Sequence, residues 1–438
     1  MTSYWAENAW LGGNAVTAGV LIRVEDGVIA DVSRGPAPDG AVRLAGVTVP
    51  GLANAHSHAF HRALRGRTQR GGGTFWTWRE QMYAVAAALT PESYFALARA
   101  CYAEMALAGV TCVGEFHYLH HDVDGKPYAA GNVMSEALVA AAAEAGIRIT
   151  LLDTCYLAGG LGRPVEGPQL RFSDGTAEAW ATRVSSFAPD PSMARVGAAI
   201  HSVRAVPADQ LAPIVAWAAN RPLHVHLSEQ RAENEACLAA YGRTPTELLQ
   251  EHGALGPQTS AVHATHLTGS DIAVLGGSRT SICMCPTTER DLADGIGPAR
   301  ALATAGSPVT LGSDSHAVID LFEEARAVEL GERLRTERRG HWRAADLLGA
   351  ATACGHASLG WPSAGRLVTG ALADFVTVAT DSVRMAGVAP LLESVVFAAT
   401  AGDVRDVVVA GRRIVADGRH LLVDDVPAAL ARSIVDVT

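Results

Sequence analysis

The chain has 438 residues, of which 49% are hydrophobic, so it is long enough for a barrel of about 250 residues with additional structure. Its net charge of −10 argues against a nucleic-acid or anionic-membrane partner, but not against an anionic substrate in a locally basic pocket. The sequence has neither the features of a signal peptide nor an apolar run of about 18 residues. Its seven scattered cysteines form no CxxC pair, so we expect reduced thiols in a cytoplasmic protein.

Eight short apolar runs alternate with helix-like segments between Val47 and Ser315. Continuous apolar runs are typical of parallel strands that are buried on both faces. Eight such strands alternating with helices predict an α/β fold, a (β/α)8 TIM barrel. The predicted strands cover residues 47–58, 110–120, 148–157, 195–203, 222–229, 260–267, 280–286 and 308–315.

Helical patterns between these runs include residues 91–109 and 132–146. The first of them opens with Thr90 as a candidate N-cap and Pro91 at the first helical position, which is a common helix start. This segment should therefore be a helix on the outside of the barrel.

The two ends of the chain have a different pattern. Residues 19–47 and 366–425 contain short β-like strands with glycine turns, and residues 404–420 predict a hairpin. We expect the ends, residues 1–48 and 366–438, to pair into one small composite β domain. Residues 49–365 then form the catalytic barrel.

Most of the 16 histidines lie at or just beyond the predicted strand ends, where the active site of a TIM barrel is built. Side chains two residues apart on a strand share a face, so His56 and His58 can both enter the barrel mouth. His224 and His226 have the same relation, but His224 lies deeper, and we expect it to pack in the core. The other histidines in this position are His61, His117, His120, His121, His201, His263, His266 and His316.

A metal site is the first chemistry that these histidines indicate. Imidazole nitrogens and a carboxylate are typical zinc ligands, and the eighth predicted strand is followed by Asp314. Each residue has an alternative interpretation: an HxH pair is common, and Asp314 could cap the next helix. Their combination at matching strand ends favours a metal site, with ligands His56, His58, His226 and Asp314.

Several motifs resemble those of the amidohydrolase superfamily: HSH at 56–58, HLSE at 226–229, VHATH at 262–266 and GSD at 312–314. A closer resemblance, from about Leu11 to Arg412, is to the formimidoylglutamate deiminases of histidine degradation. It is carried by PGLANAHSHAFHRALRG (50–66), FWTWREQMY (75–83), EFHYLHHD (115–122), HSVRAV (201–206), HVHLSEQ (224–230) and LGSDSH (311–316).

This resemblance implies one catalytic divalent metal ion, usually zinc, and a homodimer. Members with two metal ions commonly bridge them with a lysine at the end of the fourth strand. The single lysine of this chain, Lys126, follows the second predicted strand instead, which favours one ion.

Three residues have the chemistry for hydrolysis at the predicted metal site. Asp314 can accept the proton of the attacking water, and Glu229 can transfer a proton to the leaving nitrogen. His263 can orient the water and stabilise the tetrahedral intermediate. His266 competes for this last role, but the resemblance favours the earlier histidine. Glu229 by itself could equally be a surface carboxylate that starts a helix.

The resemblance also points to substrate contacts. It implies that Arg204 with His201, and Arg79 with Tyr118, bind the carboxylates of a small dianionic substrate. Without it, either arginine could be an ordinary surface residue. His61 departs from the family, which usually has glutamine there, and imidazole cannot present the donor and acceptor of an amide together. We expect His61 to face the substrate, while Trp76 and Trp78 anchor their loop.

The function that the resemblance implies is metal-dependent hydrolytic deimination of N-formimino-L-glutamate to N-formyl-L-glutamate and ammonia. One alternative is a related aminohydrolase, namely a purine, pterin or cytosine-type deaminase or a chlorohydrolase. These enzymes act on flat neutral rings, which do not need two arginines at the mouth. The other is a metal-binding barrel without activity, which would not need Glu229 and His263.

Overall fold

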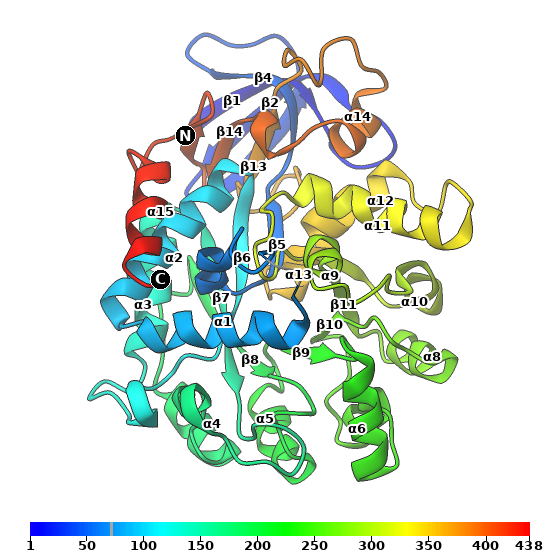
Figure 1. Cartoon of the computed structure of the whole chain (residues 1–438). Coiled ribbons are helices and arrows are strands. Elements are labelled where there is room, and N and C mark those ends of the chain that lie inside the picture. Colours follow the sequence, from blue (N-terminus) through cyan, green and yellow to red (C-terminus); the bar gives the residue numbers. More distant parts are fainter. Residues whose placement is uncertain (71–72) are drawn as a thin grey trace.

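A barrel of eight parallel strands forms the centre of the molecule, in a computed structural model that describes residues 1–70 and 73–438 (Figure 1). The strands lie in chain order, and each corresponds to a predicted one, so the predicted (β/α)8 fold is confirmed. They are β5 (Leu52–Ser57), β6 (Val110–His117), β7 (Arg148–Cys155), β8 (Ala194–Ile200), β9 (Leu223–Leu227), β10 (Thr259–His263), β11 (Ser281–Met284) and β12 (Val309–Leu311).

The first and last barrel strands, β5 and β12, meet at their C-terminal ends. The backbone N–H of Asp314 donates to the carbonyl of His56 at 3.0 Å, and His58 donates to the carbonyl of Asp314 at 3.3 Å. Close by, the Asn54 side chain accepts from the Ser313 N–H at 2.9 Å and donates to its hydroxyl at 2.7 Å. These bonds bring the predicted metal ligands of the two strands together.

Helices surround the barrel (Figure 1). The predicted helix after the first barrel strand begins at Pro91, and Thr90 caps it with its side chain, as expected. The helices are α1 (Phe75–Ala88), α2 (Pro91–Leu107), α3 (Val133–Ala145), α4 (Ala177–Ser185), α5 (Leu211–Trp217), α6 (Arg231–Tyr241), α7 (Pro245–Glu251), α8 (Gly269–Gly277), α9 (Pro286–Asp291), α10 (Ala299–Ala305), α11 (Leu321–Thr336), α12 (Ala344–Gly349) and α13 (Gly355–Ser358).

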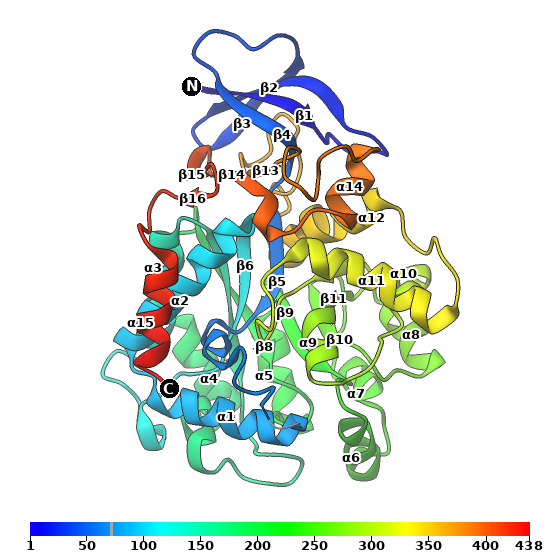
Figure 2. The same ribbon diagram turned by 45° about the horizontal axis from the view of Figure 1, so that its top comes forward.

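A second sheet joins the two ends of the chain, as predicted (Figure 2). Its central pair is β4 with β13, in which Val49 from the N-terminal part lies opposite Val376 from the C-terminal part. The predicted hairpin is present as β14 and β15. The sheet order is β16 (Arg419–His420), β15 (Arg412–Ala416), β14 (Val404–Val409), β13 (Phe375–Val378), β4 (Val42–Pro50), β1 (Thr2–Ala9), β2 (Thr17–Glu25) and β3 (Val28–Arg34).

One predicted strand is divided between the two sheets. Residues 47–58 form the end of β4 and the whole of β5, with Gly51 between them. A Cβ atom at position 51 would lie 2.2 Å from Oγ1 of Thr111, so a side chain cannot be accommodated where the chain passes into the barrel.

The last helix, α15 (Val426–Val435), packs against α2 of the barrel (Figure 2). The segment that follows the small sheet in sequence therefore contacts the barrel, and the domain boundaries at residues 48 and 366 stay a prediction. Among the described residues, no helix has the length and apolar character needed to cross a membrane.

Candidate active site

A cavity of about 320 Å³ lies at the C-terminal ends of the barrel strands. The predicted site residues come together there, and all of them except His56 line the cavity. His56 lies beneath it and is fully buried. The lining residues among them are His58, His61, Arg79, Tyr118, His201, Arg204, His226, Glu229, His263 and Asp314.

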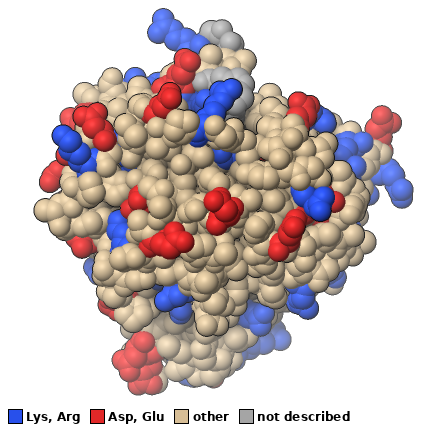
Figure 3. Space-filling model, turned by 90° about the horizontal axis from the view of Figure 1, so that it is seen from below, with Lys and Arg blue, Asp and Glu red and all other residues tan. Residues whose placement is uncertain are grey.

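The surface around this end of the barrel carries mixed charge. Figure 3 views the molecule from the side to which the strand ends point, and the described acidic and basic side chains are interspersed with uncharged surface. The described part of this face therefore does not present the broad basic patch that would suit a nucleic acid.

Three histidines and one aspartate form a compact donor group. One donor atom from each of His56, His58, His226 and Asp314 lies within 4.8 Å of the others. The Nε2 atoms of His56 and His58 both lie 3.3 Å from Oδ1 of Asp314. Nε2 of His226 is 3.1 Å from Nε2 of His56. This is the predicted set of ligands: His56 lies in β5 and His226 in β9, while His58 directly follows β5 and Asp314 lies three residues beyond the end of β12.

Hydrogen bonds hold two of these imidazoles in a suitable orientation. Nδ1 of His58 is 2.9 Å from the carbonyl of Phe116, and Nδ1 of His226 is 2.9 Å from the carbonyl of His201. Since a carbonyl only accepts, Nδ1 donates in each pair, and the Nε2 lone pair is directed into the donor group.

Burial and hydrogen bonding set the charge of the donor group. Burial lowers the pKa of His56 to about 4, despite the hydrogen bond to Asp314, and it lowers the pKa of His226 well below its usual value. For Asp314 burial acts in the opposite direction, but the adjacent imidazoles of His56 and His58 hold the pKa of its carboxyl well below its usual value. Neutral imidazoles and an ionised carboxylate are the forms that bind a divalent metal ion.

Three residues at or just beyond the ends of the barrel strands have a strained backbone conformation. Asp314, His263 and Ser228 have positive φ angles of 44°, 67° and 51°, which are unusual for residues other than glycine. Such conformations are concentrated at functional sites. Asp314 is not the cap of the following helix, because the N-cap of α11 is Asp320.

His263 is surrounded by carboxylates. Its Nε2 lies 3.7 Å from Asp314 and 4.0 Å from Glu229, and its Nδ1 lies 3.4 Å from Oε1 of Glu289. Burial alone would lower the pKa of His263, but the charges of Glu229 and Asp314 and the hydrogen bond to Glu289 raise it well above its usual value. His266, the competing residue of the sequence analysis, is not among the residues that line the cavity.

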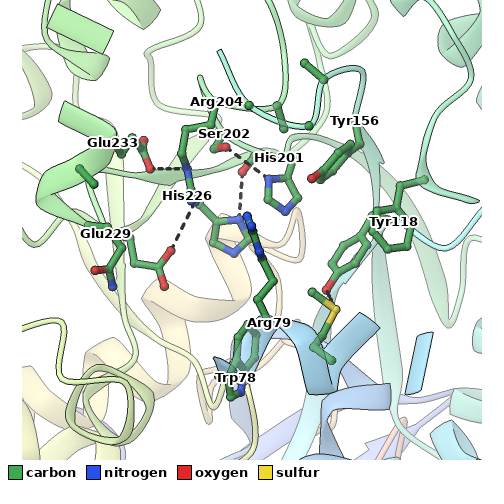
Figure 4. A pocket seen from close by; sticks show the side chains of 18 of the residues that line it. Trp78, Arg79, Tyr118, Tyr156, His201, Ser202, Arg204, His226, Glu229 and Glu233 are labelled. Carbon is green, nitrogen blue, oxygen red and sulfur yellow. Dashed lines mark hydrogen bonds and ion pairs between the residues drawn. The ribbon is translucent and has the colours of Figure 1, made fainter. Parts of the chain in front are cut away.

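Arg204 lies at the wall between two glutamates (Figure 4). Its Nε is 3.0 Å from Oε2 of Glu233, and its Nη2 is 3.7 Å from Oε2 of Glu229. Burial lowers the pKa of Arg204, but the charges of Glu233 and Glu229 raise it above its usual value. Glu233 was not expected from the sequence, where it is one of two acidic residues in α6.

Arg79 and Tyr118 line another part of the cavity. Arg79 belongs to α1, and its guanidinium lies 5.6 Å from the centre of the Tyr83 ring. The hydroxyl of Tyr118 is 2.9 Å from Nε2 of His61, whose ring also lies 5.1 Å from that of Trp78. The side chain of Trp76, the other expected anchor, lies outside the described residues.

The sequence from residue 47 to residue 414 matches the model of the amidohydrolase family. The chain belongs to the amidohydrolase family. This amidohydrolase is a hydrolase that acts on carbon–nitrogen bonds.

Individual relatives agree with this assignment. The amidohydrolase is 39% identical over 411 residues to a formimidoylglutamate deiminase of Pseudomonas aeruginosa, covering 90% of each chain. It is 31% identical over 407 residues to a 5-methylthioadenosine/S-adenosylhomocysteine deaminase of Natronomonas pharaonis, covering 92% of this chain and 89% of the relative. A crystal structure of an amidohydrolase from Brucella melitensis is 34% identical, with a TM-score of 0.91 and full coverage of both chains.

Two further tyrosines of the amidohydrolase line the cavity and were not singled out from the sequence. The amide nitrogen of Gln169 donates to the hydroxyls of Tyr83 at 2.9 Å and Tyr156 at 3.0 Å. The amide oxygen of Gln169 accepts from the backbone N–H of Glu166, which fixes the orientation of the amide. The two phenol groups therefore form an ordered polar wall.

Not every histidine at a strand end faces this cavity. His117 and His120 form a separate buried group with Asp153, because Phe116 and His117 point to opposite faces of β6. Arg183 binds both carboxylate oxygens of Asp153, at 2.8 and 3.1 Å. His224 is fully buried, and burial lowers its pKa to about 3, in agreement with the expectation that it packs in the core.

Proposed function

We propose that this amidohydrolase hydrolyses N-formimino-L-glutamate to N-formyl-L-glutamate and ammonia, a step in histidine degradation. The observation that carries the proposal is the presence of Arg79 and Arg204 in the cavity that contains the metal-binding group. Two guanidinium groups suit a substrate with two carboxylates. The 39% identity to a formimidoylglutamate deiminase supports the same conclusion.

We infer that the resident metal is a single divalent ion, most simply zinc, held by His56, His58, His226 and Asp314. When bound, such an ion lowers the pKa of a water ligand towards about 7 and so supplies the nucleophile for hydrolysis. The inference of one ion is supported by the sequence after β8, which begins with His201 and contains no lysine. Lys126, the single lysine, follows the short 3-10 turn Val123–Gly125.

Hydrolysis requires two proton transfers that the side chains of this cavity can perform. Water adds to the formimino carbon, and the bond from this carbon to its terminal nitrogen breaks to release ammonia. In this proposal Asp314 accepts the proton of the water, and Glu229 delivers a proton to the departing nitrogen. The carboxylates around His263 raise its pKa, so in this proposal its imidazolium stabilises the developing oxygen charge.

The two carboxylates of the substrate have different partners in this proposal. Arg204 with His201 binds one of them, and Arg79 with Tyr118 binds the other. Burial lowers the pKa of His201 well below its usual value, so it acts as a neutral hydrogen-bond partner. His61, which forms a hydrogen bond with the hydroxyl of Tyr118, faces the formimino group of the substrate in this proposal.

A second candidate is deamination of an adenosine-type substrate, which is favoured by the 31% identity to the deaminase of N. pharaonis. The purine ring is neutral, and S-adenosylhomocysteine has one carboxylate, whereas two arginines line the cavity, so we rank this function below the first. We further propose a homodimer in the cytoplasm, on the basis of the resemblance to the deiminases.

The identity of the products tests the proposed reaction. The protein loaded with zinc is incubated with N-formimino-L-glutamate, and the products are quantified by proton NMR and an ammonia assay. We expect N-formyl-L-glutamate and ammonia in equal amounts. Glutamate and formamide would show that the other carbon–nitrogen bond is broken, which would contradict the proposed roles of His61 and Glu229.

A further inference from the structure

Glu233 lies behind Arg204 in the wall of the cavity (Figure 4). It belongs to the first turn of α6 and is 1% exposed. One carboxylate oxygen lies 3.0 Å from Nε of Arg204, and the other accepts from the backbone N–H of Ser228 at 3.3 Å. The side chain therefore connects the arginine to the residue directly before Glu229.

We propose that Glu233 is a positioning residue for substrate recognition, which holds the guanidinium of Arg204 in the orientation that receives a substrate carboxylate. This inference rests on the proposed function. An arginine side chain is flexible, but the ion pair of 3.0 Å with a buried carboxylate restricts where the guanidinium of Arg204 can lie. Recognition residues need such support from a second layer of hydrogen bonds.

Glu229 also lies near the guanidinium of Arg204. Nη2 of Arg204 is only 3.7 Å from Oε2 of Glu229, the carboxylate proposed to transfer the proton. The contact between Arg204 and Glu233 is shorter, at 3.0 Å, so the guanidinium of Arg204 lies closer to Glu233 than to the proton-transfer carboxylate.

The substitution E233Q removes one of the two contacts with little change in volume. A glutamine amide has one accepting oxygen and one donating nitrogen, whereas both partners of Glu233 are donors. We expect KM for N-formimino-L-glutamate to rise by about 10-fold or more, because the negative charge paired with Arg204 is lost. We expect kcat to change by less than about 3-fold, because the groups that transfer protons remain.

Glu329 of α11 provides a matched control. It is fully buried, and its carboxylate accepts from Nε of Arg333 at 2.6 Å and from the backbone N–H of Gly340 at 3.0 Å. It therefore has the same kinds of partner as Glu233 but does not line the cavity. The variant E329Q should lose thermal stability while its KM stays at the wild-type value.

A double-mutant cycle with R204Q provides the decisive readout. If Glu233 acts through Arg204, adding E233Q to R204Q should change kcat/KM by less than about 2-fold, since the two residues are coupled. If E233Q does not yield folded protein, E233D, whose side chain is one methylene shorter, should show the same increase in KM.

Three results would overturn this inference. Unchanged KM in folded E233Q would show that Arg204 does not need Glu233, and so would a full effect of E233Q in the R204Q background. Absence of ammonia release by the wild-type protein would instead overturn the proposed function, and the inference with it. The wild-type assay therefore separates the two failures.

Discussion

Asp314 and His56 are joined twice: the backbone N–H of Asp314 donates to the carbonyl of His56 at 3.0 Å, and its carboxylate lies 3.3 Å from the imidazole Nε2 of the same residue. The first contact brings the first and last barrel strands together, and the second forms part of the metal-binding group. Assembly of the site and closure of the barrel thus depend on the same pair of residues.

Replacing Asp314 should abolish both metal retention and turnover. The variant D314N keeps the shape of the side chain and the backbone bond to His56, but it loses the only carboxylate of the donor group. We expect less than one metal ion per chain after dialysis, measured by plasma mass spectrometry, and a fall in kcat of about 1,000-fold or more. Wild-type metal content in D314N would contradict the assignment of this ligand.

Substitutions of His61 test whether this residue contacts the formimino group of the substrate. The variant H61Q introduces the amide that the deiminases usually have, which can still bond to the Tyr118 hydroxyl. We expect kcat/KM to stay within about 3-fold of wild type in H61Q and to fall by about 10-fold or more in H61A. Equal activity of H61A and wild type would show that His61 does not contact the substrate.

Asp294 should make stability depend on pH. Burial and the charge of Glu229 raise its pKa to about 8. This carboxyl is protonated in the folded protein but ionised in the unfolded chain, so unfolding releases a proton. The free energy of unfolding should therefore fall as pH rises from about 4 to about 8, and this contribution should be constant above pH 8.

The variant D294N does not titrate at this position and keeps the oxygen that accepts from Gln230. Urea unfolding from pH 5 to pH 9 should show that the stability of D294N relative to wild type increases up to about pH 8 and then levels off. A difference that is the same at every pH would contradict the raised pKa.

Gly51 should be required where the chain passes from the small sheet into the barrel. In G51A the new methyl group would lie 2.2 Å from Oγ1 of Thr111, and relieving this clash should cost about 1–3 kcal/mol in the free energy of unfolding. At Gly256 an added Cβ atom would meet no other atom within 4 Å, so G256A provides the control. Equal urea midpoints for the two variants would contradict the proposed role of Gly51.

The sequence was sufficient to predict the strands and the metal-binding group because both follow a local rule. Residues two apart on a strand share a face, so His56 and His58 could be assigned to the barrel mouth without knowledge of the tertiary structure. Asp314 followed from its place after the eighth apolar run. The same rule applies to β6, in which Phe116 and His117 point to opposite faces. Once Phe116 is known to face inward, the rule places His117 on the outer face.

Residues that enter the site from helices and loops could not be predicted in this way. Glu233 and Glu289 are each one of two acidic residues in their helices, and nothing in their local sequence indicates that they contact Arg204 and His263. Gln169 lies 13 residues from Tyr156 in the sequence, but 86 residues from Tyr83. Such contacts depend on how separate elements pack, which a pattern of apolar residues does not determine.

A comparison of kcat/KM for four substrates tests the central claim most directly. Ammonia release by the protein loaded with zinc is measured for N-formimino-L-glutamate, guanine, cytosine and S-adenosylhomocysteine under the same conditions. We predict efficient turnover of N-formimino-L-glutamate alone, because it can engage both Arg79 and Arg204. Turnover of one of the ring-containing substrates, with none of N-formimino-L-glutamate, would contradict the proposed function while leaving the barrel and the metal-binding group in place.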